Sequence, residues 1–362
     1  MIKRPKLKFT IISFVLIAIL MNLIFKRIPE FVEKNYSLGF DKTIRQALSI
    51  STGYIPFSFG EFLVIFLFLL LVILVLIVFI KIKNGGALNA ILNLVTYLSA
   101  LYIIFMVFWG FNYNRLSFDK ISNLKIEKSS KQDLYLLCED LIKRANMLRE
   151  QVNENSQGVM IIPGGYKDVL KRTKIGYDIA EKKYKELGGK YGPPKPILLS
   201  RALNYTGITG IYIPFTGEAN VNVAVTDLLL PATAAHEAAH QRGFAREDEA
   251  NYIAYLTCTM HSDYDFKYSG TMLALIYSMN ALYDKDNSAY KELVKTYSEG
   301  VKKDLQYDSE FWSKYEGKVQ DFSDKVNNSY LKSNGQEDGV QSYGRMVDLL
   351  LAEYKEKNKL AK

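Results

Sequence analysis

Cysteine and histidine are both scarce in this sequence, and each shortage restricts the possible structures. Only 2 of the 362 residues are cysteine, Cys138 and Cys258, so neither a disulfide-stapled framework nor a cysteine-ligated zinc ribbon can form. Both cysteines fall on predicted helices among apolar neighbours, and we expect them to be buried free thiols. Only 3 residues are histidine, so a regular spacing between histidines is unusual enough to be informative.

Positive charge exceeds negative charge, but the patterns that recognise nucleic acids are missing. The formal net charge is +8 and the isoelectric point is near 9.0. No RNP-like, helix-turn-helix or zinc-finger pattern accompanies this charge. We therefore expect no nucleic-acid partner, and we interpret the excess as ordinary surface charge.

Long apolar runs are confined to the first third of the chain. Residues 9–25, 62–80 and 91–111 carry no charged side chain over 17, 19 and 21 positions. As helices they would measure roughly 26 to 32 Å, which matches a hydrocarbon core of about 30 Å. We therefore predict three transmembrane helices in a membrane domain of residues 1–111, with the lipid bilayer as a partner.

Flanking basic residues predict how these helices are inserted. They cluster before the first run and after the second, at Lys3, Arg4, Lys6, Lys8, Lys81 and Lys83. Such clusters stay on the cytoplasmic side of a membrane. The first run lacks a small-residue cleavage site, so we interpret it as an uncleaved anchor. The prediction is a multi-pass protein of a bacterial plasma membrane whose C-terminal domain is extracytoplasmic.

The remaining residues, 112–362, predict one mostly helical α+β domain with a small sheet. Residues 211–215 and 219–225 are predicted to be short strands on either side of a Thr216-Gly217 turn. No internal repeat or low-complexity linker divides the region. Helices are predicted at about 130–151, 166–187, 229–242, 245–262, 267–285, 288–304, 309–330 and 340–357.

Two of the three histidines lie in the sequence His236-Glu-Ala-Ala-His240. On a helix, residues four apart share a face, so both imidazoles can reach one zinc ion. Glu237 between them can then take a proton from water as a general base. Pro231 and the alanines that follow it favour a helix at this position.

A catalytic zinc ion needs a third protein ligand and an open position. In HExxHxxGxxH enzymes the third ligand would be residue 246, but Arg246 cannot bind a cation. The alternative is Glu247 from the next helix, with Asn251 one turn later holding a histidine ligand in place. Glu249 is the second choice for the third ligand, because a helix places it on another face.

These residues resemble those of the gluzincin class of zinc metallopeptidases. The chain is similar to an uncharacterised bacterial family with three N-terminal membrane helices, through three segments. The segments are residues 212–220 (YIPFTGEAN), residues 236–251 (HEAAHQRGFAREDEAN) and residues 268–270 (YSG). The resemblance implies a zincin-like domain, one Zn²⁺ ion and a peptide or protein substrate. Asn251 departs from the commoner gluzincin pattern, which has aspartate there.

In enzymes of this class an extended strand beside the active helix binds the substrate by β-addition. The candidate strand here is 219–225, and the candidate substrate-binding residues are Tyr212, Asn220 and Tyr268. An oxyanion partner should stand opposite the metal. The choice between Tyr212, Tyr268, Tyr343 and Arg345 stays open from the sequence.

The predicted function is a membrane-anchored, zinc-dependent peptidase with His236, His240 and Glu247 as metal ligands. An intramembrane protease is disfavoured, because residues 226–235 are too short and too polar to span a bilayer. A zinc-binding sensor or assembly factor without turnover is the other candidate. The presence of Glu237 favours catalysis, since an inactive descendant would not need that base.

Overall fold

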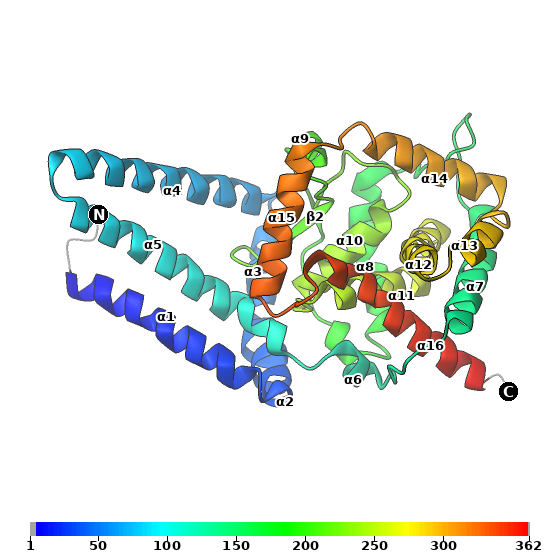
Figure 1. Cartoon of the computed structure of the whole chain (residues 1–362), viewed down its shortest axis with the longest axis horizontal. Coiled ribbons are helices and arrows are strands. Elements are labelled where there is room, and N and C mark those ends of the chain that lie inside the picture. Colours follow the sequence, from blue (N-terminus) through cyan, green and yellow to red (C-terminus); the bar gives the residue numbers. More distant parts are fainter. Residues whose placement is uncertain (1–4, 361–362) are drawn as a thin grey trace.

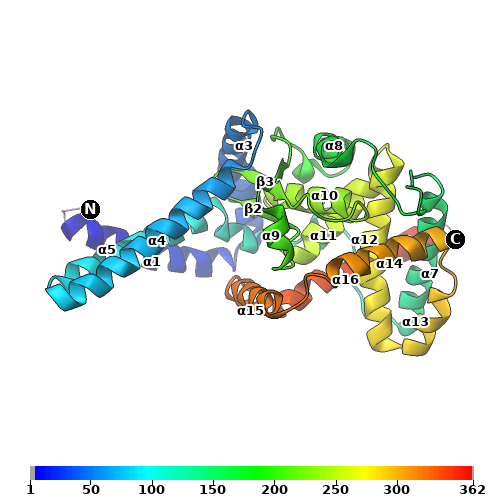
Figure 2. The same ribbon diagram turned by 90° about the horizontal axis from the view of Figure 1, so that it is seen from above.

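The computed structural model describes residues 5–360, and most of them are helical (Figure 1). Three long apolar helices extend side by side from one end of the molecule, and the remaining helices gather at the other end around a small sheet (Figures 1 and 2). Lys3 and Arg4, which contribute to the predicted orientation, lie outside the described residues.

The three apolar helices are α1 (Pro5–Phe25), α4 (Phe59–Asn84) and α5 (Ala87–Phe108), and α5 contacts both of the others. Each is long and apolar enough to cross a membrane. At most 17% of the most apolar window in any of them is covered by the protein, as expected for side chains that face lipid. The predicted end of the third run at residue 111 is wrong. The helix stops at Phe108 because the backbone of Trp109, at φ −154°, is not helical, and the 3₁₀ helix η2 (Gly110–Asn114) follows.

The segment between the first two runs was not predicted to be helical, yet it forms three helices. They are α2 (Pro29–Phe31), the π-helix η1 (Val32–Phe40) and α3 (Asp41–Gly53). The buried face of α3 consists of Asp41, Arg45 and Ser49, which are polar. A search for apolar periodicity therefore misses this helix, because its buried contacts are hydrogen bonds.

The C-terminal region is built around a core of packed helices, in which α7, α10, α11 and α12 contact one another most extensively. Cys138 and Cys258 are buried in this core as free thiols, as predicted. The helical elements are α6 (Phe118–Ser122), α7 (Lys131–Arg149), α8 (Gly165–Ala180), η3 (Lys185–Leu187), α9 (Ser200–Asn204), α10 (Leu230–Gln241), α11 (Glu247–Met260), α12 (Tyr264–Lys285), α13 (Asn287–Val294), α14 (Glu299–Trp312), α15 (Lys318–Ser333), η4 (Gly339–Arg345) and α16 (Met346–Leu360).

Local capping explains which helix boundaries were predicted well. Helix α7 begins with a capping box between Ser130 and Asp133, as its sequence suggests. The prediction of one helix over 166–187 is wrong, since α8 ends at Ala180 and a turn precedes η3. The predictions over 288–304 and 309–330 are also wrong. The Ser298 hydroxyl accepts a hydrogen bond from the Val301 amide and starts a separate helix there.

The sheet has three short strands, β1 (Lys195–Pro196), β2 (Gly210–Ile213) and β3 (Glu218–Val221). Strands β2 and β3 lie on either side of the predicted turn, in which Gly217 has a positive φ of 66°, but both end earlier than predicted. They pair in antiparallel fashion. Strand β1 pairs with β3 in parallel, which places β3 at the centre. The prediction that residues 219–225 bind substrate by β-addition is therefore wrong, because both edges of β3 are occupied. The edge strand beside α10 is β2.

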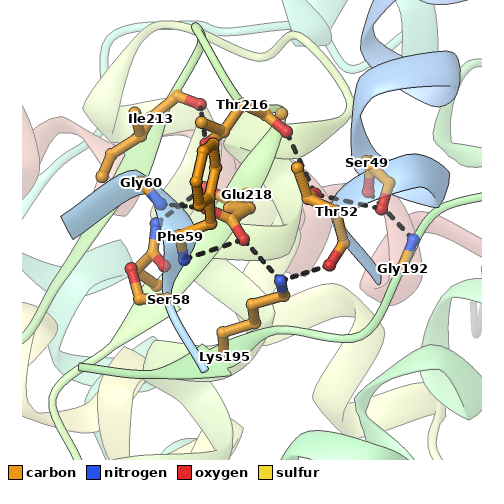
Figure 3. A network of polar contacts seen from close by, with 12 residues as sticks. Ser49, Thr52, Ser58, Phe59, Gly60, Gly192, Lys195, Ile213, Thr216 and Glu218 are labelled. Atoms are coloured by element: carbon orange, nitrogen blue, oxygen red, sulfur yellow. Dashed lines mark hydrogen bonds and ion pairs between the residues drawn. The ribbon is translucent and has the colours of Figure 1, made fainter. Parts of the chain in front are cut away.

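A buried polar network connects the start of α4 to this sheet (Figure 3). The Glu218 carboxylate accepts hydrogen bonds from the backbone amides of Phe59 and Gly60 in the first turn of α4. It also pairs with the Lys195 ammonium, and both side chains are at least 95% buried. Gly60 is required there, since a Cβ atom would lie within 3 Å of Ile213, Thr216 and Glu218 side-chain atoms. This network fixes the start of α4 relative to the sheet.

Replacement of Glu218 by alanine should destabilise the protein strongly. The change leaves the Lys195 ammonium buried without its partner, and breaking such a pair from one side costs about 3–5 kcal/mol. The measurement is thermal unfolding of the purified full chain in detergent, followed by circular dichroism. The exposed Glu316→Ala is the matched control and should unfold like wild type. An unchanged midpoint for Glu218→Ala would contradict the described role of the network.

Candidate functional site

The two motif histidines lie on one face of α10, near its C-terminal end. Pro231 occupies the first turn and a run of alanines follows, so the segment is a strong helix former. The rings of His236 and His240 are 4.6 Å apart between centroids and nearly perpendicular. Gly243, at a positive φ of 84°, ends the helix and turns the chain back toward α11.

Helix α11 brings Glu247 onto the two rings. Ala250 and Ala254 are fully buried on α11, and their small size allows the close contact with α10. The Glu247 Oε2 atom lies 3.2 Å from His236 Nε2 and 3.4 Å from His240 Nε2. One ligand atom from each of the three residues lies within 4.8 Å of the others. The structure thus brings together the three predicted metal ligands.

The other ring nitrogen of each histidine is held by an acceptor. His240 Nδ1 donates to the Phe244 carbonyl at 2.7 Å, since a carbonyl can only accept. His236 Nδ1 lies 2.8 Å from Asn251 Oδ1, and the Asn251 amide group donates from Nδ2 to the Tyr343 carbonyl. Both Nδ1 atoms therefore carry the proton in the neutral rings, and both Nε2 atoms present lone pairs. This arrangement is typical of histidine metal ligands.

The donor set fits a metal cation. The buried Glu247 Oε2 atom has no hydrogen-bond donor among the described residues, although two Nε2 atoms face it. Lone pairs that face one another in a buried site are stable only when a cation, either a proton or a metal ion, lies between them. Two imidazole nitrogens and one carboxylate oxygen are ligands that zinc prefers, and they leave a fourth position free.

The charged forms of Glu247 and His240 stabilise each other. Burial raises the pKa of Glu247, but His240 and His236 outweigh burial and lower it to about 2. Burial lowers the pKa of His240, but the Glu247 carboxylate outweighs burial and raises it to about 9. The cluster thus keeps Glu247 ionised and attracts positive charge, which is what a cation site requires.

Glu237 lies between α10 and the edge strand β2. A Cβ atom added to Gly210 of β2 would lie 2.4 Å from Glu237 Oε1, so only glycine leaves room for this carboxyl group. The side chain is buried, and its Oε2 atom has no hydrogen-bond partner within residues 5–360. Burial raises the pKa of Glu237 to about 7, despite the opposing effect of the two histidines. A carboxyl group with this pKa can both accept and release a proton near neutral pH.

Glu249, the second choice for the third ligand, does not join the cluster. Its Oε1 atom accepts a hydrogen bond from the Phe118 amide at 2.8 Å and pairs with Arg246. It is buried against α6 on another face of α11. Its role is to hold the segment before α11 against α6.

The three predicted substrate-binding residues are buried, and their role stays a prediction. Asn220 is fully buried in β3, where its amide donates to the Ile211 and Glu218 carbonyls. Tyr268 is also fully buried, and its hydroxyl donates to Asp304 at 2.8 Å. Tyr212 packs its ring on Trp109, with the rings 4.7 Å apart, and is 8% exposed. Among the described residues, the Tyr212 hydroxyl and Asn220 Oδ1 have no hydrogen-bond partner, whereas the Tyr268 hydroxyl has one.

Of the four candidate oxyanion partners, Tyr343 stacks on a residue of the cluster. Its ring stacks on that of His236 at 6.5 Å, with 19° between the planes, and it is half-buried. Arg345 is exposed and pairs with Asp338 at 3.3 Å. Tyr268 donates its hydroxyl to Asp304, and the Tyr212 ring packs on Trp109.

Three residues of the site were missed by the sequence reasoning. Trp109, directly after α5, packs the edge of its ring on His240 at 5.7 Å. Gly210 makes room for Glu237, and the Phe244 carbonyl holds His240. The contact between Phe244 and His240 could have been predicted from Gly243. A glycine after the second histidine predicts a tight turn, which brings the next residue back onto the helix. No local pattern indicates Trp109 or Gly210, because each is distant from the motif in sequence.

Replacement of Asn251 by alanine should weaken zinc binding about 10- to 100-fold. The change removes the acceptor that orients His236, and such partners of ligands contribute by this amount. The measurement is competition for zinc with a chromogenic chelator, on the full chain in detergent. Asn251→Asp is the matched control, because a carboxylate oxygen can still accept from Nδ1. Equal affinity of wild type and Asn251→Ala would contradict the orienting role.

Comparison with known proteins gives one match. A family model described as "Protein of unknown function (DUF3810)" matches residues 36–351 of the chain. No curated protein and no solved structure matches the chain. The matched region contains α3, two of the apolar helices and the whole histidine and glutamate cluster.

Proposed function

The chain belongs to the DUF3810 family, and from its site we propose that it is a membrane-anchored zinc metallopeptidase of the gluzincin type. The observation that carries the proposal is the convergence of two histidine Nε2 atoms on a buried glutamate, with a second buried glutamate beside them. A zincin-like domain is part of the proposal, and the hairpin beside α10 supports it.

His236, His240 and Glu247 would hold the zinc ion. When bound, zinc would polarise the scissile carbonyl group and lower the pKa of a water molecule toward 7. Asn251 and the Phe244 carbonyl keep both rings in the orientation that the metal requires. Cys138 and Cys258 take no part, because they are buried elsewhere in the core.

Glu237 is the proposed general base and general acid. It would accept a proton from water and then donate it to the leaving amine, and its burial, which raises the pKa of the carboxyl group, favours the second of these transfers. Its position beside Gly210 places this proton transfer next to the edge strand. The phenol of Tyr343 is the proposed hydrogen-bond donor to the oxyanion, because its ring stacks on His236.

The substrate is proposed to be a peptide segment that pairs in extended form with the open edge of β2. That strand leaves one edge unpaired within the described part of the chain, and its Ile211 side chain is 45% exposed. Main-chain hydrogen bonds to an edge strand bind peptides with little sequence preference. Peptide binding at β2 would bring a scissile bond close to Glu237.

The apolar helices are proposed to anchor the site at a bacterial plasma membrane, with the C-terminal domain outside the cytoplasm. Trp109 supports a site close to the bilayer, because it follows α5 directly and packs on His240. Tryptophan is enriched at membrane interfaces. The basic residues beside α1 and α4 support the proposed orientation.

The proposal is tested by incubating the full chain, in detergent or lipid nanodiscs, with a mixed peptide library. We expect new peptide ends that appear with the protein, disappear after chelation and return with zinc. A chain that binds zinc at these residues but cleaves no peptide would instead indicate the zinc sensor or assembly factor. A chain that binds no zinc would overturn both.

A further inference from the structure

A cavity lies against α10, on the side away from the proposed metal ligands. It has a volume of about 620 Å³ and lies between α8, residues 189–196 and the end of α10. Ala238 and Arg242 of α10 line it. Ala238 is two residues beyond His236, and a helix turns about 200° over that distance. The cavity therefore contacts the motif helix but is separate from the cluster.

The charges around this cavity have one sign. Lysines follow one face of α8 at positions 167, 171 and 174, and all three line the cavity together with Arg242. None of the residues that line it is acidic. Lys174 pairs with Asp178, which does not line the cavity, whereas Lys167, Lys171 and Arg242 form no ion pair within residues 5–360. Such an excess of positive charge around one cavity favours an anionic ligand.

Arg242 is the most informative of these residues, because it is 95% buried and lacks an acidic partner. Its guanidinium lies over the Tyr177 ring at 3.7 Å and the Tyr191 ring at 4.8 Å. Nε donates to the Leu187 carbonyl and Nη1 to the Ala238 carbonyl. Nη2 makes no hydrogen bond to any residue from 5 to 360, and no carboxylate forms an ion pair with the group there. Burial lowers the pKa of Arg242, and Tyr177, Tyr191 and Asp178 only partly oppose this effect.

The rest of the cavity wall is mostly apolar. The rings of Tyr166 and Tyr177, the Leu170 side chain and the prolines at 193, 194 and 196 form it. Ligand sites commonly combine such a wall with a few placed polar groups. Pro56 also lines the cavity and lies three residues before α4 begins, so the cavity is close to the membrane end of the domain.

We propose that this cavity binds an organic phosphate, with its anionic group against Arg242 and the three lysines and its apolar part on the tyrosine and proline wall. Arginine and lysine are the usual phosphate-binding side chains in proteins. Bound there, the ligand compensates the buried charge of Arg242 and contacts the motif helix at Ala238. The ligand is either a membrane lipid with a phosphomonoester headgroup or a soluble phosphate ester. The inference does not depend on zinc or on peptidase activity.

The test is isothermal titration of the full chain in a non-ionic detergent with two probes, phenyl phosphate and dioctanoyl phosphatidic acid. Tighter binding of the phosphatidic acid indicates the lipid source, and tighter binding of phenyl phosphate indicates the soluble source. The triple variant Lys167→Gln, Lys171→Gln, Lys174→Gln should raise Kd at least about tenfold for the probe that binds. These lysines are exposed, so the variant retains the fold.

The matched control is the triple variant Lys314→Gln, Lys325→Gln, Lys332→Gln. It changes the net charge equally, and all three lysines are exposed away from the cavity. Its Kd should equal that of wild type. The proposal is overturned if neither probe binds wild type, or if both triple variants lose affinity equally.

Discussion

Replacement of Glu237 by glutamine should lower peptide hydrolysis about 100- to 10,000-fold while zinc stays bound. The side chain keeps its size and its place beside Gly210, but it can no longer accept a proton. A positioned general base contributes this range of rate enhancement. The measurement is the initial rate on a cleaved library peptide, with zinc content determined on the same preparation.

The control for this prediction is zinc retention, because Glu237 is not among the proposed ligands. A variant that loses zinc together with activity would show that the residue acts on the metal site. Wild-type turnover by Glu237→Gln would contradict the role of Glu237 as the base.

Replacement of Glu247 by alanine should weaken zinc binding more than about 100-fold and abolish hydrolysis. Loss of a residue that only orients a ligand already costs 10- to 100-fold, and Glu247 is proposed to bind the metal itself. The change also removes the only carboxylate within 4 Å of both histidine Nε2 atoms in the described part of the chain. The measurement is zinc affinity by chelator competition, followed by the rate on the same library peptide.

Glu249→Ala is the matched comparison, two residues along the same helix. It leaves the Phe118 amide and Arg246 without their partner and should cost about 1–3 kcal/mol of unfolding free energy. Its zinc affinity should stay at the wild-type value. The reverse outcome, with zinc lost from Glu249→Ala and kept by Glu247→Ala, would exchange the assigned roles.

The arrangement of the candidate site was predictable where it depends on helix periodicity alone. His236 and His240 are one turn apart on α10, and Glu247 and Asn251 are one turn apart on α11, so each pair shares a face. A turn centred on Gly243 then brings the two pairs together. The spacing within each pair and the position of the turn involve residues close together in the chain, so both can be read from the sequence.

The burial and the hydrogen-bond partners of the residues around the site depend on contacts between segments that are distant in sequence. The type of a residue does not reveal these contacts. Asn220 and Tyr268 are polar and lie in motif-like segments, yet the Asn220 amide nitrogen and the Tyr268 hydroxyl both donate hydrogen bonds inside the core. The two residues of β1 are too few to form a recognisable strand, and their pairing makes β3 central rather than an edge. Helix α3 was missed because its buried face is polar.

The central claim is that His236, His240 and Glu247 bind one zinc ion, and X-ray absorption at the zinc edge tests it most directly. The full chain, purified with zinc, should show imidazole nitrogen at about 2.0–2.1 Å and oxygen at about 2.0–2.2 Å. The imidazole contribution should disappear in the double variant His236→Ala, His240→Ala. A sulfur shell near about 2.3 Å, an unchanged spectrum in that variant, or no bound zinc would contradict the claim.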